Sequence, residues 1–320
     1  MSNLLHEREY YKPFNYPWAF EFYQQQQQMH WMPSEVNLAD DLKDYRENLS
    51  EGNKKLLSQL FRFFTQADVD VCCGYAKHYL PTFKQPEVRM MLSAFAAMEA
   101  VHQEAYSLLL ETLGYGDEEY KSFMDHKAMM DKHEYLSDFG MATNNDIAKT
   151  LAIYSGFTEG VQLFSSFAIL LNFSRHNLMK GMGQIVTWSV RDESLHVEGM
   201  SKLFRTFIQE NPELWTDDLK YEIYCAAERT VDLEDAFIEL CFKGAEVPDL
   251  TPKQVKDYIR FIADRRLAGL GLKGIFHSKE NPLPWLDYIL NGVEHTNFFE
   301  NRATEYSKGS TTGNWQDIFK

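Results

Sequence analysis

The spacing of apolar residues along the chain predicts a protein built from long helices. Apolar side chains recur every three or four positions through most of the sequence, which is the period of an α-helix with one buried face. No stretch shows the strict alternation of apolar and polar residues that is typical of strands, and no internal repeat is visible. The pattern predicts long helices over about 53–79, 87–113, 146–170, 182–210, 217–243 and 252–270.

Proline and glycine mark the ends of these predicted helices. Pro81 should stop the first helix, Gly114 should cap the second, and Pro212 should end the fourth. Residues 115–145 are polar and are expected to form a connection that carries a shorter helix. The glutamine run at 24–28 is expected to be a solvated turn or a short helix.

The predicted helices form a single domain over residues 1–305. Beyond this point the periodicity is lost, and residues 306–320 are expected to be a flexible tail that ends in an apolar hook formed by Trp315, Ile318 and Phe319.

Polar side chains interrupt the apolar stripe of the second helix at regular positions. Glu99, His102 and Tyr106 follow one another at spacings of three and four, so they share one face with apolar neighbours. An ionised glutamate alone in an apolar interior would cost roughly several kcal/mol. A bound metal ion would compensate this buried charge.

A second Glu-x-x-His pair and two further carboxylates complete a set of six candidate metal ligands. Glu193 and His196 repeat the spacing of the first pair, and Asp68 and Glu159 lie in the apolar stripes of two other helices. One carboxylate from each of two helices and one Glu-x-x-His pair from each of two others are the ligands of a di-metal carboxylate site in a four-helix bundle. Oxygen-rich donors with one imidazole per ion favour iron or manganese over zinc and leave positions open for dioxygen.

Other acidic residues and histidines fit this site less well. Asp70 competes with Asp68 but falls on a more polar face, so Asp68 is the better candidate. Glu104 and Glu198 lie off the ligand stripes, and His176 lies in a polar connection. These three are expected to lie outside the ligand set.

Composition narrows the class of protein. The 320 residues carry a formal net charge of −15, which argues against a broad surface for nucleic acid or anionic membranes. The four cysteines form neither a CxxC motif nor a disulfide framework, and no run approaches the roughly 18 apolar residues of a membrane span. With no signal-peptide pattern at the N-terminus, the expected location is the cytoplasm.

The ordered series of motifs resembles the radical-generating small subunit of class I ribonucleotide reductase. The resemblance rests on His30 and Trp31, FFTQAD (63–68), MEAVHQEAYSLLLET (98–112), TEGVQLFSSFA (158–168), RDESLH (191–196), ADR (263–265) and TNFFENR (296–302). It implies a ferritin-like, all-α helical bundle. It also implies one metal ion on Asp68, Glu99 and His102, a second on Glu159, Glu193 and His196, and a stable radical on Tyr106.

The same resemblance implies a long-range relay. Trp31 matches the relay tryptophan, Asp192 matches the aspartate that links a metal-bound histidine to it, and Tyr306 matches the tail tyrosine that passes the oxidising equivalent to the large subunit. The implied partners are therefore the large catalytic subunit, reached through the C-terminal tail, and a second copy of the chain in a homodimer.

The expected activity is the generation of an oxidant that starts reduction of ribonucleotides to deoxyribonucleotides in the large subunit. The cofactor is expected to be two metal ions per chain, most readily two irons, with manganese and iron or two manganese ions as alternatives. No Gly-rich phosphate loop is present, so the nucleotide should bind elsewhere. The alternative functions are a two-electron oxidase of the same fold and, less in keeping with the chain's length, ferritin-like iron storage.

Overall fold

The computed structural model describes residues 3–136 and 139–290 and contains only helices and connections in this part of the chain. Residues Met1–Leu283 form a helical body, and a second unit begins at Pro284, of which the short helix 284–290 is described. The α-helices of the body are α1 (Pro17–Gln28), α2 (Ala39–Lys43), α3 (Glu51–Gly74), α4 (Leu80–Thr82), α5 (Pro86–Leu113), α6 (Lys127–Leu136), α7 (Asn144–Thr150), α8 (Phe164–Arg175), α9 (Lys180–Glu210), α10 (Asp217–Phe242) and α11 (Pro252–Gly269). The expected all-α fold is confirmed.

Shorter helical pieces connect or extend these helices. In the described part of the chain, the π-helical pieces are Asp44–Asn48, Tyr75–Tyr79 and Leu151–Glu159, and the 3₁₀ helices are Asn3–Leu5, Pro33–Glu35, Asp117–Asp125 and Pro212–Leu214. π-Helical turns are rare and occur most often as insertions next to functional sites.

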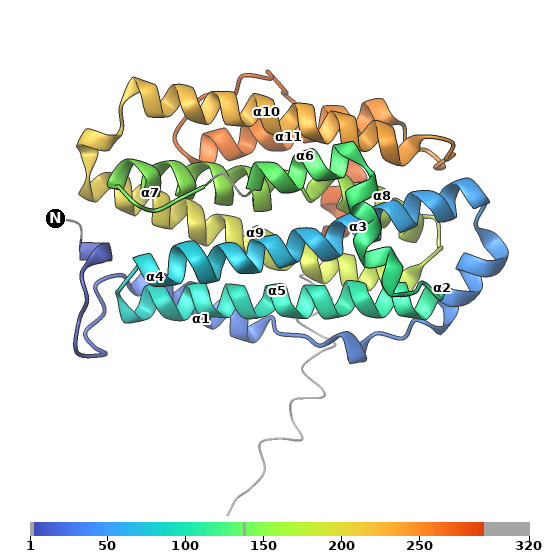
Figure 1. Cartoon of the computed structure of the whole chain (residues 1–320), viewed down its shortest axis with the longest axis horizontal. Helices are drawn as coiled ribbons and strands as arrows, with labels where there is room; N and C mark the ends of the chain where they lie inside the picture. The colour runs from blue at the N-terminus through green and yellow to red at the C-terminus, as the bar shows by residue number, and fades with distance from the viewer. Residues whose placement is uncertain (1–2, 137–138, 291–320) are drawn as a thin grey trace, which may run out of the picture. The chain divides into compact units, whose positions relative to one another are not determined.

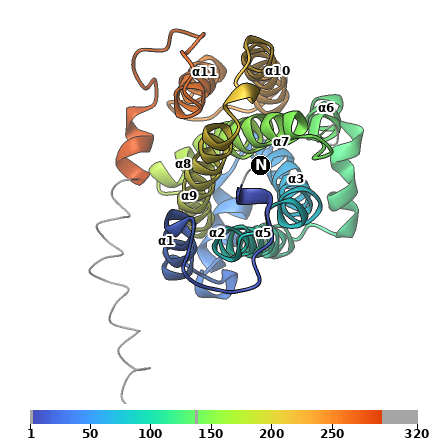
Figure 2. The same ribbon diagram turned by 90° about the vertical axis from the view of Figure 1, so that its left-hand side faces the viewer.

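The long helices of the body surround a shared apolar core. α3 and α5 lie side by side, and α9 packs against α8 and the π-helical segment Leu151–Glu159 (Figure 1). α1 covers the outside of α5 and α9, whereas α10 and α11 pack together on the opposite flank (Figure 2). The elements that carry the predicted ligands therefore face one another in the centre.

Local sequence signals fix where these helices begin and end. Pro86 opens α5 at a position where a missing backbone N–H has no cost, and Gly114 closes it with the left-handed φ of 91° that glycine accepts readily. The side chain of Thr251 accepts a hydrogen bond from the backbone N–H of Gln254 at the start of α11. The first predicted helix extends one residue past Pro81, to Thr82.

A glycine allows α5 and α9 to approach closely at the level of the predicted site. A Cβ atom on Gly199 would lie only 2.9 Å from the ring of Phe95. That ring packs against the imidazole of His196, with ring centroids 4.4 Å apart. A larger residue at position 199 would push the two ligand-bearing helices apart.

The helix predicted from Asp146 to about 170 is not continuous. It begins at Asn144 as α7, continues as the π-helical segment Leu151–Glu159, and turns at residues 162–163 before α8 begins. Two cationic side chains bind carbonyl groups at this break. Arg266 donates to the carbonyl of Gly160 at 2.8 Å, and Lys132 donates to the carbonyl of Gln162 at 2.9 Å.

The connection predicted over 115–145 holds two short helical elements rather than one, the 3₁₀ turn Asp117–Asp125 and α6. Among the helices that the structure describes, none is long and apolar enough to cross a membrane.

Candidate metal centre

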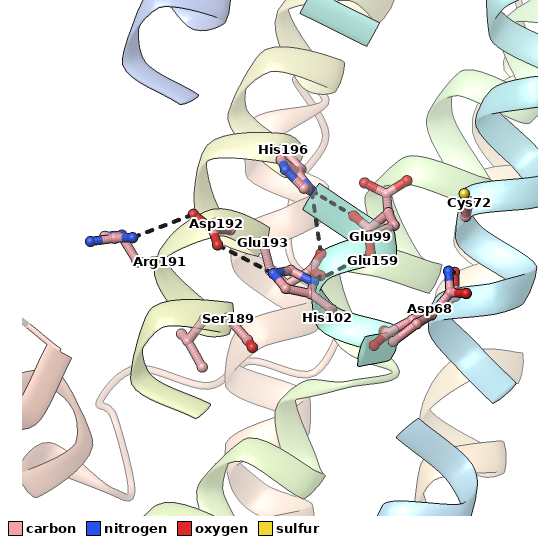
Figure 3. A network of polar contacts seen from close by, with 12 residues as sticks. Asp68, Cys72, Glu99, His102, Glu159, Ser189, Arg191, Asp192, Glu193 and His196 are labelled. Carbon is pink, nitrogen blue, oxygen red and sulfur yellow. Dashed lines mark hydrogen bonds and ion pairs between the residues drawn. The ribbon is translucent and has the colours of Figure 1, made fainter. Parts of the chain in front are cut away.

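The six predicted metal ligands lie together in the centre of the helical body (Figure 3). α3 supplies one carboxylate, the π-helical segment supplies another, and α5 and α9 each supply a glutamate and a histidine. Every one of these side chains is at most 1% exposed: Asp68, Glu159, Glu99, His102, Glu193 and His196. The pairs three residues apart project from the same face of their helix, as their spacing predicts.

The ligand atoms form two groups, in each of which all atoms lie within 4.8 Å of one another. The first group contains Asp68, Glu99, His102 and Glu193, and the second contains Glu159, Glu193 and His196. The first group holds the three residues predicted for one ion, the second holds the three predicted for the other, and Glu193 belongs to both. Its two oxygens could therefore serve both groups.

Both histidines direct one ring nitrogen into the site and the other to a fixed partner. Nε2 of His102 lies 3.2 Å from Oδ2 of Asp192, and Nε2 of His196 lies 3.0 Å from Oε1 of Gln26. Because these partners hold Nε2, Nδ1 of each ring is the nitrogen that points toward the carboxylates and would be available to an ion. Nδ1 of His196 lies 2.9 Å from a Glu99 oxygen.

The site has more buried negative charge than the described residues compensate. Apart from the nearby Nδ1 atoms of His102 and His196, the described residues offer no hydrogen-bond donor to Oδ2 of Asp68, Oε1 of Glu159 or either oxygen of Glu99 and Glu193. Burial raises the pKa of Asp68, Glu159 and Glu193, as expected for carboxyl groups without sufficient positive partners. Oxygen donors with one imidazole nitrogen in each group fit two cations such as iron or manganese.

Glu99 differs electrostatically from the other carboxylates of the site. Burial alone would raise its pKa, but its contacts with His102 and His196 lower the pKa overall. Glu99 is therefore the carboxylate that is most readily ionised before any ion binds.

The acidic residues and the histidine that the sequence analysis left out of the ligand set lie outside the two ligand groups in the structure as well. Asp70 accepts from Nδ1 of His133 at 2.6 Å instead of joining the ligand groups. Glu104 and Glu198 are exposed, and His176 lies 3.6 Å from Asp249 in the connection after α8.

The residues 8–282 match the profile of the family described as ribonucleotide reductase, small chain. The chain belongs to this family. It is 44% identical to a protein of Invertebrate iridescent virus 6 that carries the name ribonucleoside-diphosphate reductase small subunit, and the match spans 99% of both chains. As a small subunit of ribonucleoside-diphosphate reductase, it works with the large subunit of that enzyme.

Solved structures of small subunits share the fold. The R2 subunit of ribonucleotide reductase from Clostridium botulinum matches with a TM-score of 0.79 at 20% identity, over 86% of this chain and 89% of that one. The dimanganese(II) protein NrdF from Streptococcus sanguinis matches with a TM-score of 0.76 at 21% identity, over 88% of this chain and all of that one. The ferritin-like bundle expected from the sequence is thereby confirmed.

Two of the predicted relay residues of this small subunit, Trp31 and Asp192, lie in a hydrogen-bonded path to His102. Trp31 is buried and donates from Nε1 to Oδ2 of Asp192 at 2.8 Å, and the same oxygen faces His102. The rings of Trp31 and His102 are also stacked, with centroids 6.0 Å apart. Burial on its own would raise the pKa of Asp192, but the hydrogen bond with His102 and the nearby Arg191 lower it.

Tyr106 lies in the apolar pocket that its helical stripe predicts. It is 1% exposed, its ring stacks on Phe64 at 4.6 Å, and Phe64 in turn contacts Phe167. Its hydroxyl donates to Oγ of Ser189 at 3.1 Å. Burial raises the pKa of this phenol, so it stays protonated at neutral pH.

Gln26 is the residue at this site that the sequence pattern missed. The glutamine run forms the second half of α1, and Gln26 is buried although its neighbours Gln25 and Gln27 are exposed. Its amide nitrogen donates to Oδ1 of Asp192 at 3.2 Å while its oxygen faces His196. The run is helical, which is one of the two expected forms, but Gln26 is not solvated because α1 packs against α9.

Gln26→Leu is expected to lower the affinity for the ion held by His196 by about 10- to 100-fold, the usual effect of removing the group that orients a ligand histidine. Leucine has a similar volume but accepts no hydrogen bond, so the imidazole of His196 loses its fixed tautomer. Competition with a chromogenic chelator measures this affinity. Gln27→Leu, an exposed neighbour, is the matched control, and equal affinities of the two variants would contradict the assigned role.

Tyr306, the tail residues 306–320 and the TNFFENR motif (296–302) lie outside the described residues. The boundary predicted at residue 305 lies there too.

Proposed function

We propose that this small subunit binds two ions through Asp68, Glu99 and His102 and through Glu159, Glu193 and His196. The observation that carries the proposal is the buried excess of unpartnered carboxylate oxygens around two imidazole nitrogens that face inward. A pair of iron or manganese ions held there would supply the capacity to oxidise a nearby group by one electron at the expense of dioxygen. Iron is the expected metal, and the dimanganese(II) relative supports manganese as the alternative.

Tyr106 is the group proposed to be oxidised and to hold the radical. Its place one turn after His102 brings the phenol next to the ligands, and Phe64 and Phe167 keep water away from the ring. Its hydroxyl donates to a neutral serine hydroxyl, which does not take up the phenol proton in the resting protein. These features favour a long-lived radical because they exclude small reductants.

Trp31 and Asp192 are proposed to connect the site to the large subunit. Asp192 holds the Nε2 proton of His102 and the indole N–H of Trp31 on one oxygen, so that charge movement along the path needs little rearrangement. Tyr306, by family resemblance, would carry the oxidising equivalent onward. Reduction of ribonucleotides then takes place on the large subunit.

The tail 306–320 is proposed to dock on the large subunit through its apolar end, with affinity limited by the entropy of ordering it. The small subunit is proposed to act as a homodimer in the cytoplasm, with residues 1–305 as one domain. Sedimentation of the intact chain measures the oligomeric state.

Tyr106→Phe tests the central assignment. When the protein is loaded anaerobically with Fe(II) and exposed to oxygen, we expect the parent to give a tyrosyl signal in electron paramagnetic resonance that lasts for minutes, and the variant to lack it. Tyr258→Phe, a buried tyrosine on α11, is the control and should retain the signal. A parent that consumes oxygen without any such radical, with iron or with manganese, would point instead to a two-electron oxidase.

A further inference from the structure

Glu159 differs from the other five proposed ligands because it does not lie inside a regular α-helix. It is the last residue of the π-helical segment Leu151–Glu159, whereas the others lie within α3, α5 or α9. Oε2 of Glu159 accepts a hydrogen bond from the hydroxyl of Tyr75 at 3.0 Å, which orients the carboxylate. The position of its backbone depends on what holds the irregular segment around it.

The backbone directly after Glu159 is held by two cationic side chains. The carbonyl of Gly160 accepts from Nε of Arg266 at 2.8 Å, and the carbonyl of Gln162 accepts from Nζ of Lys132 at 2.9 Å. Helix ends leave carbonyl groups without their regular helical donors, so a break such as this one needs donors from elsewhere. These four residues, Lys132, Gly160, Gln162 and Arg266, are called the carbonyl clamp below.

The Arg266 arm of the clamp requires a glycine at its contact point. A Cβ atom at position 160 would lie 2.8 Å from Nε of Arg266 and 3.1 Å from its Cδ. The guanidinium also lies over the ring of Phe164, 5.0 Å from its centroid, at the start of α8. One side chain of α11 therefore contacts the chain on both sides of the break.

The Lys132 arm reaches both sides of the break through a buried ion pair. Lys132 is fully buried and pairs with Glu234, and the hydroxyl of Ser165, in the first turn of α8, donates to the other oxygen of Glu234. The pair thus ties Gln162 and Ser165 to α6 and α10. A buried ion pair often contributes no more stability than apolar residues of the same volume. Holding the backbone at the break gives this pair a role that apolar residues could not fill.

We propose that Lys132 and Arg266 are positioning residues for Glu159. The inference rests on the proposed function, because it concerns the second of the two ions proposed there. A metal ligand has to be held to within about 0.5 Å of its productive position by the groups around it. The carbonyl clamp supplies this support from α6 and α11, because Glu159 does not obtain it from a regular helix.

The two ions are expected to depend on the clamp to different extents. Asp68, Glu99 and His102 lie inside the regular helices α3 and α5, so their ion should bind as tightly without the clamp. The second ion should bind about 10- to 100-fold more weakly, the usual effect of removing a group that orients a ligand. General loosening of the fold would weaken both ions instead, because Glu193 belongs to both groups.

The test is an anaerobic titration of the intact chain with Mn(II), followed by equilibrium dialysis. Lys132→Met/Glu234→Leu removes one arm of the clamp without leaving a buried charge alone. Arg266→Met removes the other arm and keeps an apolar stem against Phe164. Both variants should bind the first ion with the affinity of the parent and the second about 10- to 100-fold more weakly.

The controls are matched to the two arms. Lys127→Met/Asp131→Leu removes an exposed ion pair on α6, and Arg265→Met removes the exposed neighbour of Arg266 on α11. Both controls should bind two ions with the affinities of the parent. Glu159→Ala retains only the first group, so its single affinity identifies the ion that belongs there. Urea unfolding of each metal-free variant shows that the fold is retained.

The affinities decide between positioning and a merely structural role. Binding of the second ion with parent affinity in either clamp variant would overturn the role of the arm removed in it. An equal loss of affinity for both ions would overturn the positioning role altogether. If the parent itself binds fewer than two ions, the proposed function fails and this inference fails with it. A parent with two ions and unaffected clamp variants would leave the proposed function intact.

Discussion

We expect the Glu193→Ala protein to bind neither metal ion. Glu193 is the residue shared by both ligand groups, and its oxygens lie 3.3 Å from Nδ1 of His102 and 3.8 Å from Nδ1 of His196. Its loss removes one donor from each group and the carboxylate that is able to bridge them. Elemental analysis after anaerobic loading and desalting should find two ions per chain in the parent and essentially none in this variant. Radical formation and reductase activity with the large subunit should be lost with the ions.

Two further variants distinguish a specific loss of metal binding from a general loss of the folded structure. Glu159→Ala removes a donor from the second group alone, so it should retain an ion on Asp68, Glu99 and His102. Glu198→Ala changes an exposed residue of the same helix and should keep both ions. Full loading of Glu193→Ala would show that the two groups hold their ions independently and would refute the shared role.

We expect Lys132→Ala to lower the free energy of unfolding by about 3–5 kcal/mol, the range for breaking a buried ion pair from one side. Lys132 is fully buried, pairs with Glu234 and lies over the ring of Phe63, 3.7 Å from its centroid. Burial lowers the pKa of Lys132 and raises that of Glu234, so each depends on the other to keep its charge. The variant also leaves the Gln162 carbonyl without this donor. Urea unfolding of the metal-free protein, followed by circular dichroism, measures the change.

The double variant Lys132→Met/Glu234→Leu is the informative comparison. Replacing both partners with apolar residues of similar size leaves no buried charge alone, so it should recover most of the lost stability. Lys127→Ala, in an exposed pair on the same helix, should change stability by less than about 1 kcal/mol. If Lys132→Ala unfolds at the same urea concentration as Lys127→Ala, the pair of Lys132 and Glu234 does not contribute the predicted stability.

The sequence predicts most of the site because helical ligands obey a fixed spacing. The i, i+3 pairs Glu99/His102 and Glu193/His196 determine their own geometry, since any helix projects such residues from one face. The sequence also distinguishes Asp68 from Asp70, because a buried helix face carries mainly apolar residues and only Asp68 lies on such a face. The long helices α3, α5 and α9 are predictable because their buried apolar residues recur at the same three- and four-residue spacing.

The structure differs from the sequence-based expectations at positions where tertiary contacts outweigh the local pattern of apolar and polar residues. A π-helical turn inserts one residue into the helical repeat without a sequence signal of its own, so the break before α8 and the placement of Tyr75 against Glu159 were not predictable. The run of identical glutamines gives no reason to single out Gln26. Only the packing of α1 against α9 decides which amide faces inward.

The contact of α1 with the site couples metal binding to the docking of the N-terminal segment. Gln26 lies 166 residues from Asp192 and 170 residues from His196 in the sequence, yet it contacts both side chains. Thermodynamic linkage is reciprocal, so if undocking of α1 weakens metal binding by a given factor, metal binding strengthens docking of α1 by the same factor. Ions bound at this site would therefore stabilise the docking of α1, and hydrogen exchange in α1 should slow when they bind.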